Sequence, residues 1–314
     1  MPIDAVEKIV AVDWGTSSFR AWLLSADGEP IAESRSAEGM QAVEQGNFPA
    51  VLRRHIETLA GADAGKQTIG VVMCGMVGAR QGWQEAPYGP LPASAETISA
   101  GAVEPEGAPY KTFILPGLAN RNEQAPDVMR GEETQLLGLL LERPDVSGIV
   151  AMPGTHSKWV LCENGQIRDF STVMTGELFS LIARQSIVRH SIGDAKPTGD
   201  AQSPAFQDGL AIGISDPDRT IERMFSLRAR QLLFGTDGEE IADRLSGILI
   251  GAEVASQMKR HGKNVELVAS GPMEALYSAA VAAAGGTVRV TDADKAVRKG
   301  LHHAAEIIFQ RSAA

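Results

Sequence analysis

The sequence is poor in cysteine and has no excess of basic residues. Cys74 and Cys162 are the only cysteines among its 314 residues, which is typical of a reducing compartment and predicts buried thiols in place of a disulfide. The net charge of −10 leaves no basic surface for nucleic acids or acidic membranes, so we expect neither as a partner. An anionic substrate is still compatible with this charge, because a few Arg or Lys residues can reverse the local field in a cleft.

Membrane-length apolar runs and two common nucleotide motifs are absent as well. No apolar run approaches a membrane span, and residues 1–8 carry acidic groups without an apolar core, so we expect no signal peptide and a cytoplasmic protein. The sequence contains neither G-x-x-x-x-G-K-[ST] nor G-x-G-x-x-G, which leaves P-loop and dinucleotide-binding sites without support. Its six histidines show no metal-ligand spacing.

A buried strand near the N-terminus opens into a polar turn. Residues 9–12 are apolar and partly β-branched, as expected of a central strand, and Asp13 stands where the strand leaves the sheet. The turn can offer hydroxyls and main-chain N–H groups to phosphate oxygens, through Gly15, Thr16, Ser17 and Ser18. Since a strand-end carboxylate can hold Mg²⁺ through water, this stretch is typical of a nucleotide-phosphate site. The alternative is an ordinary hairpin with a polar turn.

The same unit occurs a second time in the chain. Residues 147–151 predict a buried strand, which leads into a Gly-Thr turn and a hairpin. This second turn comprises Gly154, Thr155, His156, Ser157 and Lys158. The repeat predicts two related halves that face one cleft, each giving one phosphate-binding turn. Pro144 marks a boundary, so we expect domains at 1–144 and 145–314, with the final helix at 292–310 packing back on the first.

Three further segments follow predicted strand ends or open a helix, and ligands bind at strand ends in open α/β sheets. A glycine-rich segment follows the strand at 68–73; the residues of interest in it are Gly75, Met76, Arg80 and Trp83. A mobile surface loop explains that segment equally well. Glu132 and Glu133 open a helix, where they favour the helix dipole or point a carboxylate into a cleft. The turn at residues 270–271 suits an adenine ring and suits a simple strand–helix connection equally well.

Hydrophobic periodicity predicts the remaining elements. Further strands are expected at residues 112–115, 265–269 and 287–290. Helices are expected at residues 47–60, 176–189, 201–214, 241–260 and 273–284, with a last helix that Asp292 caps and that runs to Phe309. Residues 85–109 contain several prolines and little periodicity, which predicts a loop or lid.

Taken together, these motifs resemble the 2-dehydro-3-deoxygalactonokinase family. The segments that carry the resemblance are residues 13–20, 74–83, 130–135, 152–159, 174–179 and 250–253. The first turn, D-x-G-T-[ST]-[ST], is shared by the whole actin-like ATPase superfamily. The family implies an α/β, two-lobed actin-like (ribonuclease H-like) fold with a central cleft. It also implies transfer of phosphate from ATP to the 6-hydroxyl of 2-dehydro-3-deoxy-D-galactonate, with Mg²⁺, in galactonate catabolism. Another sugar or sugar-acid kinase of this superfamily, and a non-kinase actin-like ATPase, are the alternatives.

The resemblance assigns roles to the first lobe and to the phosphate turns. Asp13 would organise Mg²⁺, and the two turns would cradle the ATP phosphates, with Lys158 also meeting phosphate. Sugar kinases of this superfamily use a carboxylate that opens a helix as general base, and Glu132 occupies the matching place. Glu133 and Asp13 are the other candidates for the base.

The remaining assignments concern the acceptor site and the adenosine site. A forked guanidinium suits a carboxylate, so Arg80 is expected to bind the sugar acid, with Trp83 shaping the site. The same site is expected to include Gly75, Met76 and Glu177. The adenosine site is expected in the second lobe, with Ser270 and Gly271. The sequence leaves a monomer and a homodimer both open.

Overall fold

The chain divides into two compact units. The computed structural model describes residues 6–44, 46–61 and 68–313, so residues 1–5 of the N-terminal stretch discussed above lie outside the described residues. The first unit comprises Met1–Val146, Glu163–Asp169 and Ala293–Ala314, and the second comprises Ser147–Cys162 and Phe170–Asp292. The C-terminal helix is therefore part of the first unit.

The first unit is built on a sheet whose order, among the described residues, is β3-β2-β1-β4-β5. Its strands are β1 (Lys8–Trp14), β2 (Phe19–Leu24), β3 (Pro30–Ser36), β4 (Ile69–Cys74) and β5 (Lys111–Ile114). β1 pairs antiparallel with β2 and parallel with β4, which sets Asp13 opposite Arg20 on one side and Cys74 on the other. The parallel register brings the carboxyl ends of β1 and β4 to the same edge of the sheet.

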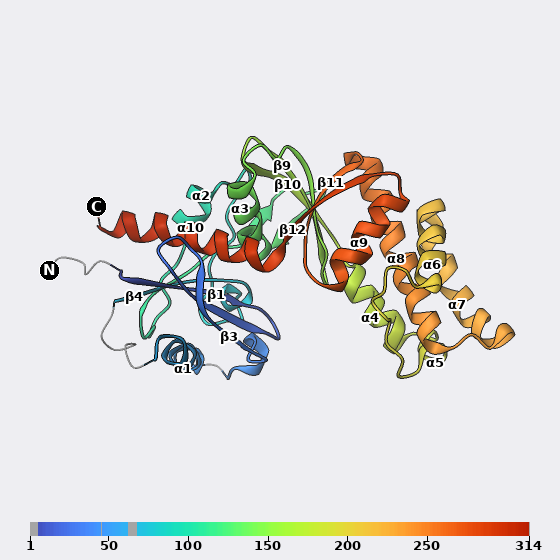
Figure 1. The fold of residues 1–314 in the computed structure, drawn as a ribbon, viewed down its shortest axis with the longest axis horizontal. Coiled ribbons are helices and arrows are strands. Elements are labelled where there is room, and N and C mark those ends of the chain that lie inside the picture. The colour runs from blue at the N-terminus through green and yellow to red at the C-terminus, as the bar shows by residue number, and fades with distance from the viewer. Residues whose placement is uncertain (1–5, 45, 62–67, 314) are drawn as a thin grey trace. The chain divides into compact units, whose positions relative to one another are not determined.

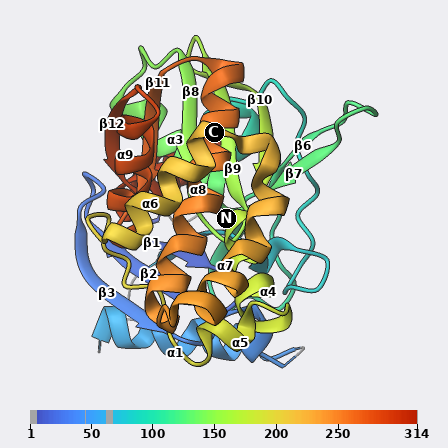
Figure 2. The same ribbon diagram turned by 90° about the vertical axis from the view of Figure 1, so that its right-hand side faces the viewer.

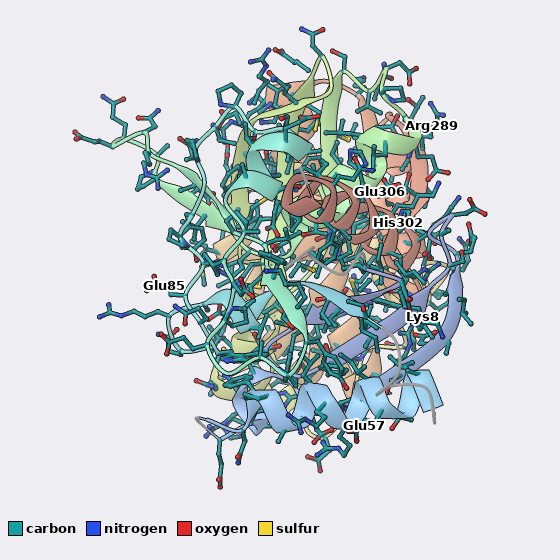
Figure 3. The ribbon with its side chains drawn as sticks, turned by 90° about the vertical axis from the view of Figure 1, so that its left-hand side faces the viewer. Lys8, Glu57, Glu85, Arg289, His302 and Glu306 are labelled. Atoms are coloured by element: carbon teal, nitrogen blue, oxygen red, sulfur yellow. The ribbon has the colours of Figure 1, made fainter. Side chains whose placement is uncertain are left out.

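Helices cover both faces of the first sheet. On one face, buried residues of α1 (Phe48–Ala60), such as Leu52 and Ile56, pack into a core with Val10 and Val12. On the other face α10 (Ala293–Ala313) contacts β1 and β4, and it also packs against α3 (Glu132–Glu142) (Figure 1). Figure 3 shows α1, which carries Glu57, on one side of the strands and α10 on the other.

The second sheet repeats the arrangement of the first. Its order among the described residues is β10-β9-β8-β11-β12. The strands are β8 (Gly148–Met152), β9 (Ser157–Glu163), β10 (Gln166–Val173), β11 (Asn264–Ala269) and β12 (Thr287–Asp292). β8 pairs antiparallel with β9 and parallel with β11, as β1 does with β2 and β4. The repeated strand–turn–hairpin unit is thus confirmed, and with it the two-lobed actin-like (ribonuclease H-like) α/β fold.

The helices of the second unit gather around one long helix, α8 (Gly238–His261). The others are α4 (Thr175–Gln185), α5 (Arg189–Ile192), α6 (Pro204–Ser215), α7 (Thr220–Phe234) and α9 (Pro272–Ala283). α6 and α8 lie side by side in Figure 2 and touch through glycines. A Cβ atom on Gly251, for example, would lie 2.7 Å from the carbonyl oxygen of Leu210. Close backbone packing therefore joins α8 to its neighbour.

The secondary structure differs from the expectations in four places. The helix expected at 176–189 is broken after Gln185, where Ser186 adopts an extended backbone conformation and its hydroxyl bonds to the Ile182 carbonyl and the Val188 N–H. Such local side-chain bonds compete with the helix. α7 was not predicted at all. The expected loop at 85–109 contains a short helix, α2 (Ala95–Ala100), which Ser94 starts with a capping box. A further hairpin, β6 (Leu118–Asn120) with β7 (Asp127–Met129), was also missed.

Two observations bear on the composition of the chain. Both cysteines are buried and free, as expected. None of the described helices is long and apolar enough to cross a membrane.

Close contact between α10 and α3 predicts the effect of one substitution. A Cβ atom on Gly300 would overlap the carbonyl oxygen of Thr134 in the first turns of α3, so Gly300→Ala should force the helices apart. Overpacking of this kind should lower the free energy of unfolding by about 1–3 kcal/mol. Urea denaturation would measure the loss, with Gln310→Ala at an exposed position of α10 as the control. An equal stability for Gly300→Ala and the control would contradict this packing.

Candidate active site

In the first unit, three chain segments meet at the carboxyl end of β1. Gly75, just after β4, has a φ of 93°, and a Cβ there would lie 2.7 Å from the Trp14 carbonyl oxygen and 3.3 Å from Asp13 Oδ1. Gly131, just before α3, has a φ of 104°, and its Cβ would lie 3.4 Å from Gly75 Cα. Glycine is required at both positions, because a side chain would be strained or would clash. The two glycines bring the start of α3, with Glu132, close to Asp13.

The first turn is held by main-chain bonds and leaves its hydroxyl side chains exposed. The Gly15 N–H donates to the Ser18 carbonyl at 2.9 Å. The 3-10 helix that begins at Met40 also holds the turn. The Met40 N–H donates to the Gly15 carbonyl at 2.9 Å, and the N–H of the next residue donates to the Thr16 carbonyl at 3.0 Å. Thr16, Ser17 and Ser18 are all exposed. The turn therefore has a fixed backbone and side chains that a ligand can reach.

Asp13 belongs to a chain of alternating charges. Arg20 donates to Asp13 with one guanidinium nitrogen and to Asp294, at the start of α10, with another. Arg35 donates to the second oxygen of Asp294 at 2.7 Å. Burial raises the pKa of Asp13, although the Arg20 guanidinium opposes this. Burial would also raise the pKa of Asp294, but the hydrogen bond from Arg35 and the nearby guanidinium charges lower it overall.

The two glutamates that open α3 have different surroundings. Glu132 is partly exposed, and its Oε2 accepts the Arg130 main-chain N–H at 3.1 Å. Glu133 has no exposed surface; it accepts the Gly131 N–H at 2.7 Å and the Thr134 hydroxyl at 3.0 Å. Burial, aided by the charge of Glu132, raises the pKa of Glu133 to about 8. Only Glu132 is open to a ligand, and Glu133 is mostly protonated at neutral pH.

The segment after β4 carries one exposed cation and one packed aromatic side chain. Arg80 is exposed, and its guanidinium has no hydrogen-bond or ion-pair partner among the residues that the structure describes. Trp83 instead stacks on Phe48 at 6.2 Å between ring centroids, and its indole N–H donates to the Glu106 carbonyl at 3.1 Å. Trp83 thus anchors the loop to the core, and it can shape a site beside Arg80 only through the position of that loop. Met76 begins a short 3-10 helix in the same loop.

The second unit holds the second turn. Gly154 and Thr155 are exposed, and the N-terminus of α4 lies against them, since the Glu177 N–H donates to the Thr155 carbonyl at 3.0 Å. His156 and Glu177 form an exposed hydrogen-bonded pair. Two members of the expected site point elsewhere: Ser157 is buried and bonds to Tyr277, and Lys158 is buried and donates to the Thr172 hydroxyl at 2.8 Å.

A cavity of about 170 Å³ adjoins this turn within the second unit. Its walls are largely apolar, with a few polar side chains, and include Gly154, Gly176, Phe179, Phe206, Leu249 and Met273. The polar side chains among its lining residues are Thr175, Asp243, Ser246 and Tyr277. Ser270 and Gly271 do not line it; Ser270 donates to Asp292 at 2.8 Å, and Gly271 precedes α9, whose first turns do line it. No local sequence pattern predicted this cavity, because its walls come from four helices and two loops.

Comparison with known proteins identifies the family. Residues 13–304 match the model of the 2-keto-3-deoxy-galactonokinase family. The chain belongs to this family. It is 44% identical over 301 residues to the probable 2-dehydro-3-deoxygalactonokinase DgoK1 of Rhizobium meliloti (strain 1021), an alignment that covers 95% of this chain and 97% of the relative.

Two more members of the family extend the comparison. The 2-dehydro-3-deoxygalactonokinase of Escherichia coli (strain K12) is 36% identical over 303 residues, which cover 96% of this chain and 98% of that protein. A crystal structure from Sinorhizobium meliloti, described as a 2-dehydro-3-deoxygalactonokinase protein, superposes with a TM-score of 0.89 at 44% identity and covers 96% of this chain and 99% of its own. The family resemblance of the sequence is thus confirmed over nearly the whole chain.

The raised pKa of Glu133 predicts a pH dependence of stability. The folded protein binds the Glu133 proton more tightly than the unfolded chain does, so this group's contribution is complete below about pH 4.5 and is lost as the pH rises to about 8. Glu133→Gln keeps the shape of the neutral acid and should lack this loss. Urea denaturation of both proteins across this pH range should show the variant gaining stability relative to wild type as the pH rises. If the difference in unfolding free energy between the two proteins does not change with pH, the pKa of Glu133 is not raised in the folded protein.

Proposed function

We propose that this protein is an ATP-dependent kinase that phosphorylates the 6-hydroxyl of 2-dehydro-3-deoxy-D-galactonate, giving the 6-phosphate and ADP, in galactonate catabolism. The observation that carries the proposal is the family match over residues 13–304, which includes both phosphate turns and the start of α3. The curated relatives bear the name of this activity at 44% and 36% identity over nearly their full length. Exposed polar side chains in each unit support the proposal.

In the first unit, we assign phosphate binding to the turn at the end of β1 and proton transfer to the start of α3. Glu132 is the general base: it is partly exposed, it opens the helix, and it can take the proton of the acceptor hydroxyl as that oxygen attacks the terminal phosphorus. The exposed hydroxyls of Thr16, Ser17 and Ser18 and the main chain at Gly15 bind phosphate oxygens. Protonated Glu133 adds no negative charge at neutral pH where an anionic substrate arrives.

The donor set of the first unit fits Mg²⁺. Asp13 offers a carboxylate that is 14% exposed, and Mg²⁺ is usually bound by one or two carboxylates, waters and substrate phosphates. Because Arg20 already bonds to Asp13, we infer that Asp13 holds the hydrated ion through water. Bound Mg²⁺ would neutralise charge on the phosphates of ATP.

The second unit suits the rest of the nucleotide. Exposed Gly154 and Thr155 present their main chain to phosphates, and the largely apolar cavity beside them suits a purine nucleoside. In this proposal the phosphate subsite at the turn and the nucleoside subsite in the cavity are bordered by His156, Glu177, Ser270 and Gly271. Ser157 and Lys158 support the turn from beneath, because their own polar atoms are engaged within the protein.

Arg80 is our proposed ligand for the carboxylate of the sugar acid. Its exposed guanidinium can form two parallel hydrogen bonds with a carboxylate, and it stands in the loop that Gly75 and Met76 begin. The overall charge of −10 makes such a local cation necessary for an anionic acceptor.

A substrate screen tests the proposed function. ADP release from ATP should be measured with 2-keto-3-deoxy sugar acids, with their parent aldonates, with common hexoses and with no acceptor at all. We expect release only with a 2-keto-3-deoxy sugar acid, and product analysis should place the phosphate on carbon 6. Turnover on hexoses but not on keto-acids would indicate a different sugar kinase, and ADP release without any acceptor would indicate an ATPase.

The assignment of the base predicts a contrast between neighbouring glutamates. Glu132→Gln should lower turnover by about 10²–10⁴-fold while the affinity for a non-hydrolysable ATP analogue stays unchanged, because only proton transfer is lost. Glu133→Gln serves as the matched control and should keep turnover within about tenfold of wild type, since it preserves the neutral form. If Glu132→Gln retains turnover and Glu133→Gln loses it, the roles are reversed.

A further inference from the structure

Glu253 is a buried carboxylate for which the proposed reaction has no direct use. It lies in the middle of α8, and only 5% of its surface is exposed. Burying an ionisable group is costly unless polar partners compensate for the lost water. The position therefore requires an explanation in terms of what Glu253 bonds to.

Four donors converge on this one carboxylate. The Trp159 indole N–H donates to Oε1 at 2.7 Å, and the Tyr277 hydroxyl donates to Oε2 at 2.7 Å. The Thr175 hydroxyl bonds to it as well. Ser157 Oγ lies 3.0 Å from the Tyr277 oxygen, and because Tyr277 donates its own proton to Glu253, the single Ser157 proton is shared between that oxygen and the carboxylate. Burial raises the pKa of Glu253, while the four hydrogen bonds oppose this.

The four donors come from the segments that form the nucleotide half-site of the second unit. Ser157 and Trp159 begin β9, directly after the turn at 154–156. Thr175 is the first residue of α4, and the next residue, Gly176, packs so closely on the turn that a Cβ would lie 2.6 Å from the Gly154 carbonyl oxygen. Tyr277 stands in α9 and lines the cavity beside the turn. One side chain thus fixes β9 and α4, which flank the turn, together with one wall of the cavity.

We propose that Glu253 is a positioning residue that holds the turn at 154–156 in the geometry that binds the phosphates of ATP. This inference rests on the proposed function. Glu253 itself does not reach the turn; it acts through Ser157 and Trp159 on one side and Thr175 on the other. A substitution that keeps a hydrogen-bond partner for Tyr277, and with it the cavity wall, should therefore weaken the binding of phosphates more than the binding of the nucleoside.

Glutamine is the sharpest substitution, because it keeps the volume and removes acceptor capacity. The indole N–H of Trp159 can only donate, so the Gln oxygen must face it and the Gln amide must face Tyr277. The hydroxyls can then turn to accept, but the bonds from Thr175 and Ser157 to an anionic acceptor are lost. At metal sites, loss of the hydrogen bonds that orient the ligands typically costs about 10–100-fold in affinity or activity, and we expect a loss at the lower end of that range here.

Calorimetric titration with two ligands separates positioning from folding. For Glu253→Gln, the affinity for the ATP analogue AMP-PNP should fall by about tenfold, while the affinity for adenosine should stay within about twofold of wild type. Gln257→Leu is the matched control: it is buried one helical turn further along α8, and its Oε1 has no hydrogen-bond partner in the described structure. It should change the melting temperature without changing the ratio of the two affinities.

The outcomes also separate this inference from the proposed function. An unchanged ratio of AMP-PNP to adenosine affinity in Glu253→Gln, or an equal fall for both ligands, would overturn the positioning role. If Glu253→Gln does not fold, Trp159→Phe removes a single donor and is judged by the same ratio. Failure of the wild-type protein to bind AMP-PNP at all would instead refute the proposed function.

Discussion

The parallel pairing of two central strands in each sheet is the constraint on which both candidate half-sites depend. In the first sheet Asp13 pairs with Cys74, so the segments after β1 and β4 leave the sheet side by side. In the second sheet Ala151 pairs with Leu267, and the turns after β8 and β11 likewise emerge at one edge. Parallel strands of this kind are buried, so the chain can present polar groups only where they end. The candidate site residues of each unit are gathered there for that reason.

The sequence predicted those features whose signals are local. About ten residues are enough to recognise a buried strand that ends in Asp13 and a turn with hydroxyl side chains. The repeat of this unit at 148–158 indicated two related sheets. Helix boundaries were predicted to within a few residues where apolar spacing was regular, as in α1 and α8. The break at Ser186 was missed, because apolar spacing continues through it and the cause is a side-chain bond to the backbone. α7 was missed as well; most of its large apolar side chains are exposed, so its pattern has no clear buried face.

Contacts between distant segments could not be predicted. Arg20 and Asp294 are 274 positions apart, and Trp159 and Glu253 are 94 apart, so no spacing rule connects them. The same limit applies to side-chain direction. Trp83 and Lys158 each stand in a motif with exposed neighbours, but packing on Phe48 and a bond to Thr172 turn their side chains into the protein. From the sequence, Glu132 was preferred over Glu133 as the general base because of its place in the motif. The burial of Glu133 could not be predicted, because it depends on how α3 packs.

The two units support their turns with different chemistry, and the difference follows from water access. Around Asp13 the supporting groups are ions that keep some contact with water, since the side chains of Arg20 and Asp294 are each 24% exposed. Beneath the second turn the support is a single carboxylate that accepts only uncharged donors in a buried site. There, loss of one hydrogen bond would leave a buried polar group with neither a protein partner nor water. Because this is costly, the donors are held in place. Under the proposed function, the first turn would stand beside Mg²⁺ and the transferring phosphoryl group and would have to tolerate changing charge, whereas the second turn would hold the rest of the nucleotide and would benefit from rigidity. The first unit meets the former requirement and the second unit the latter.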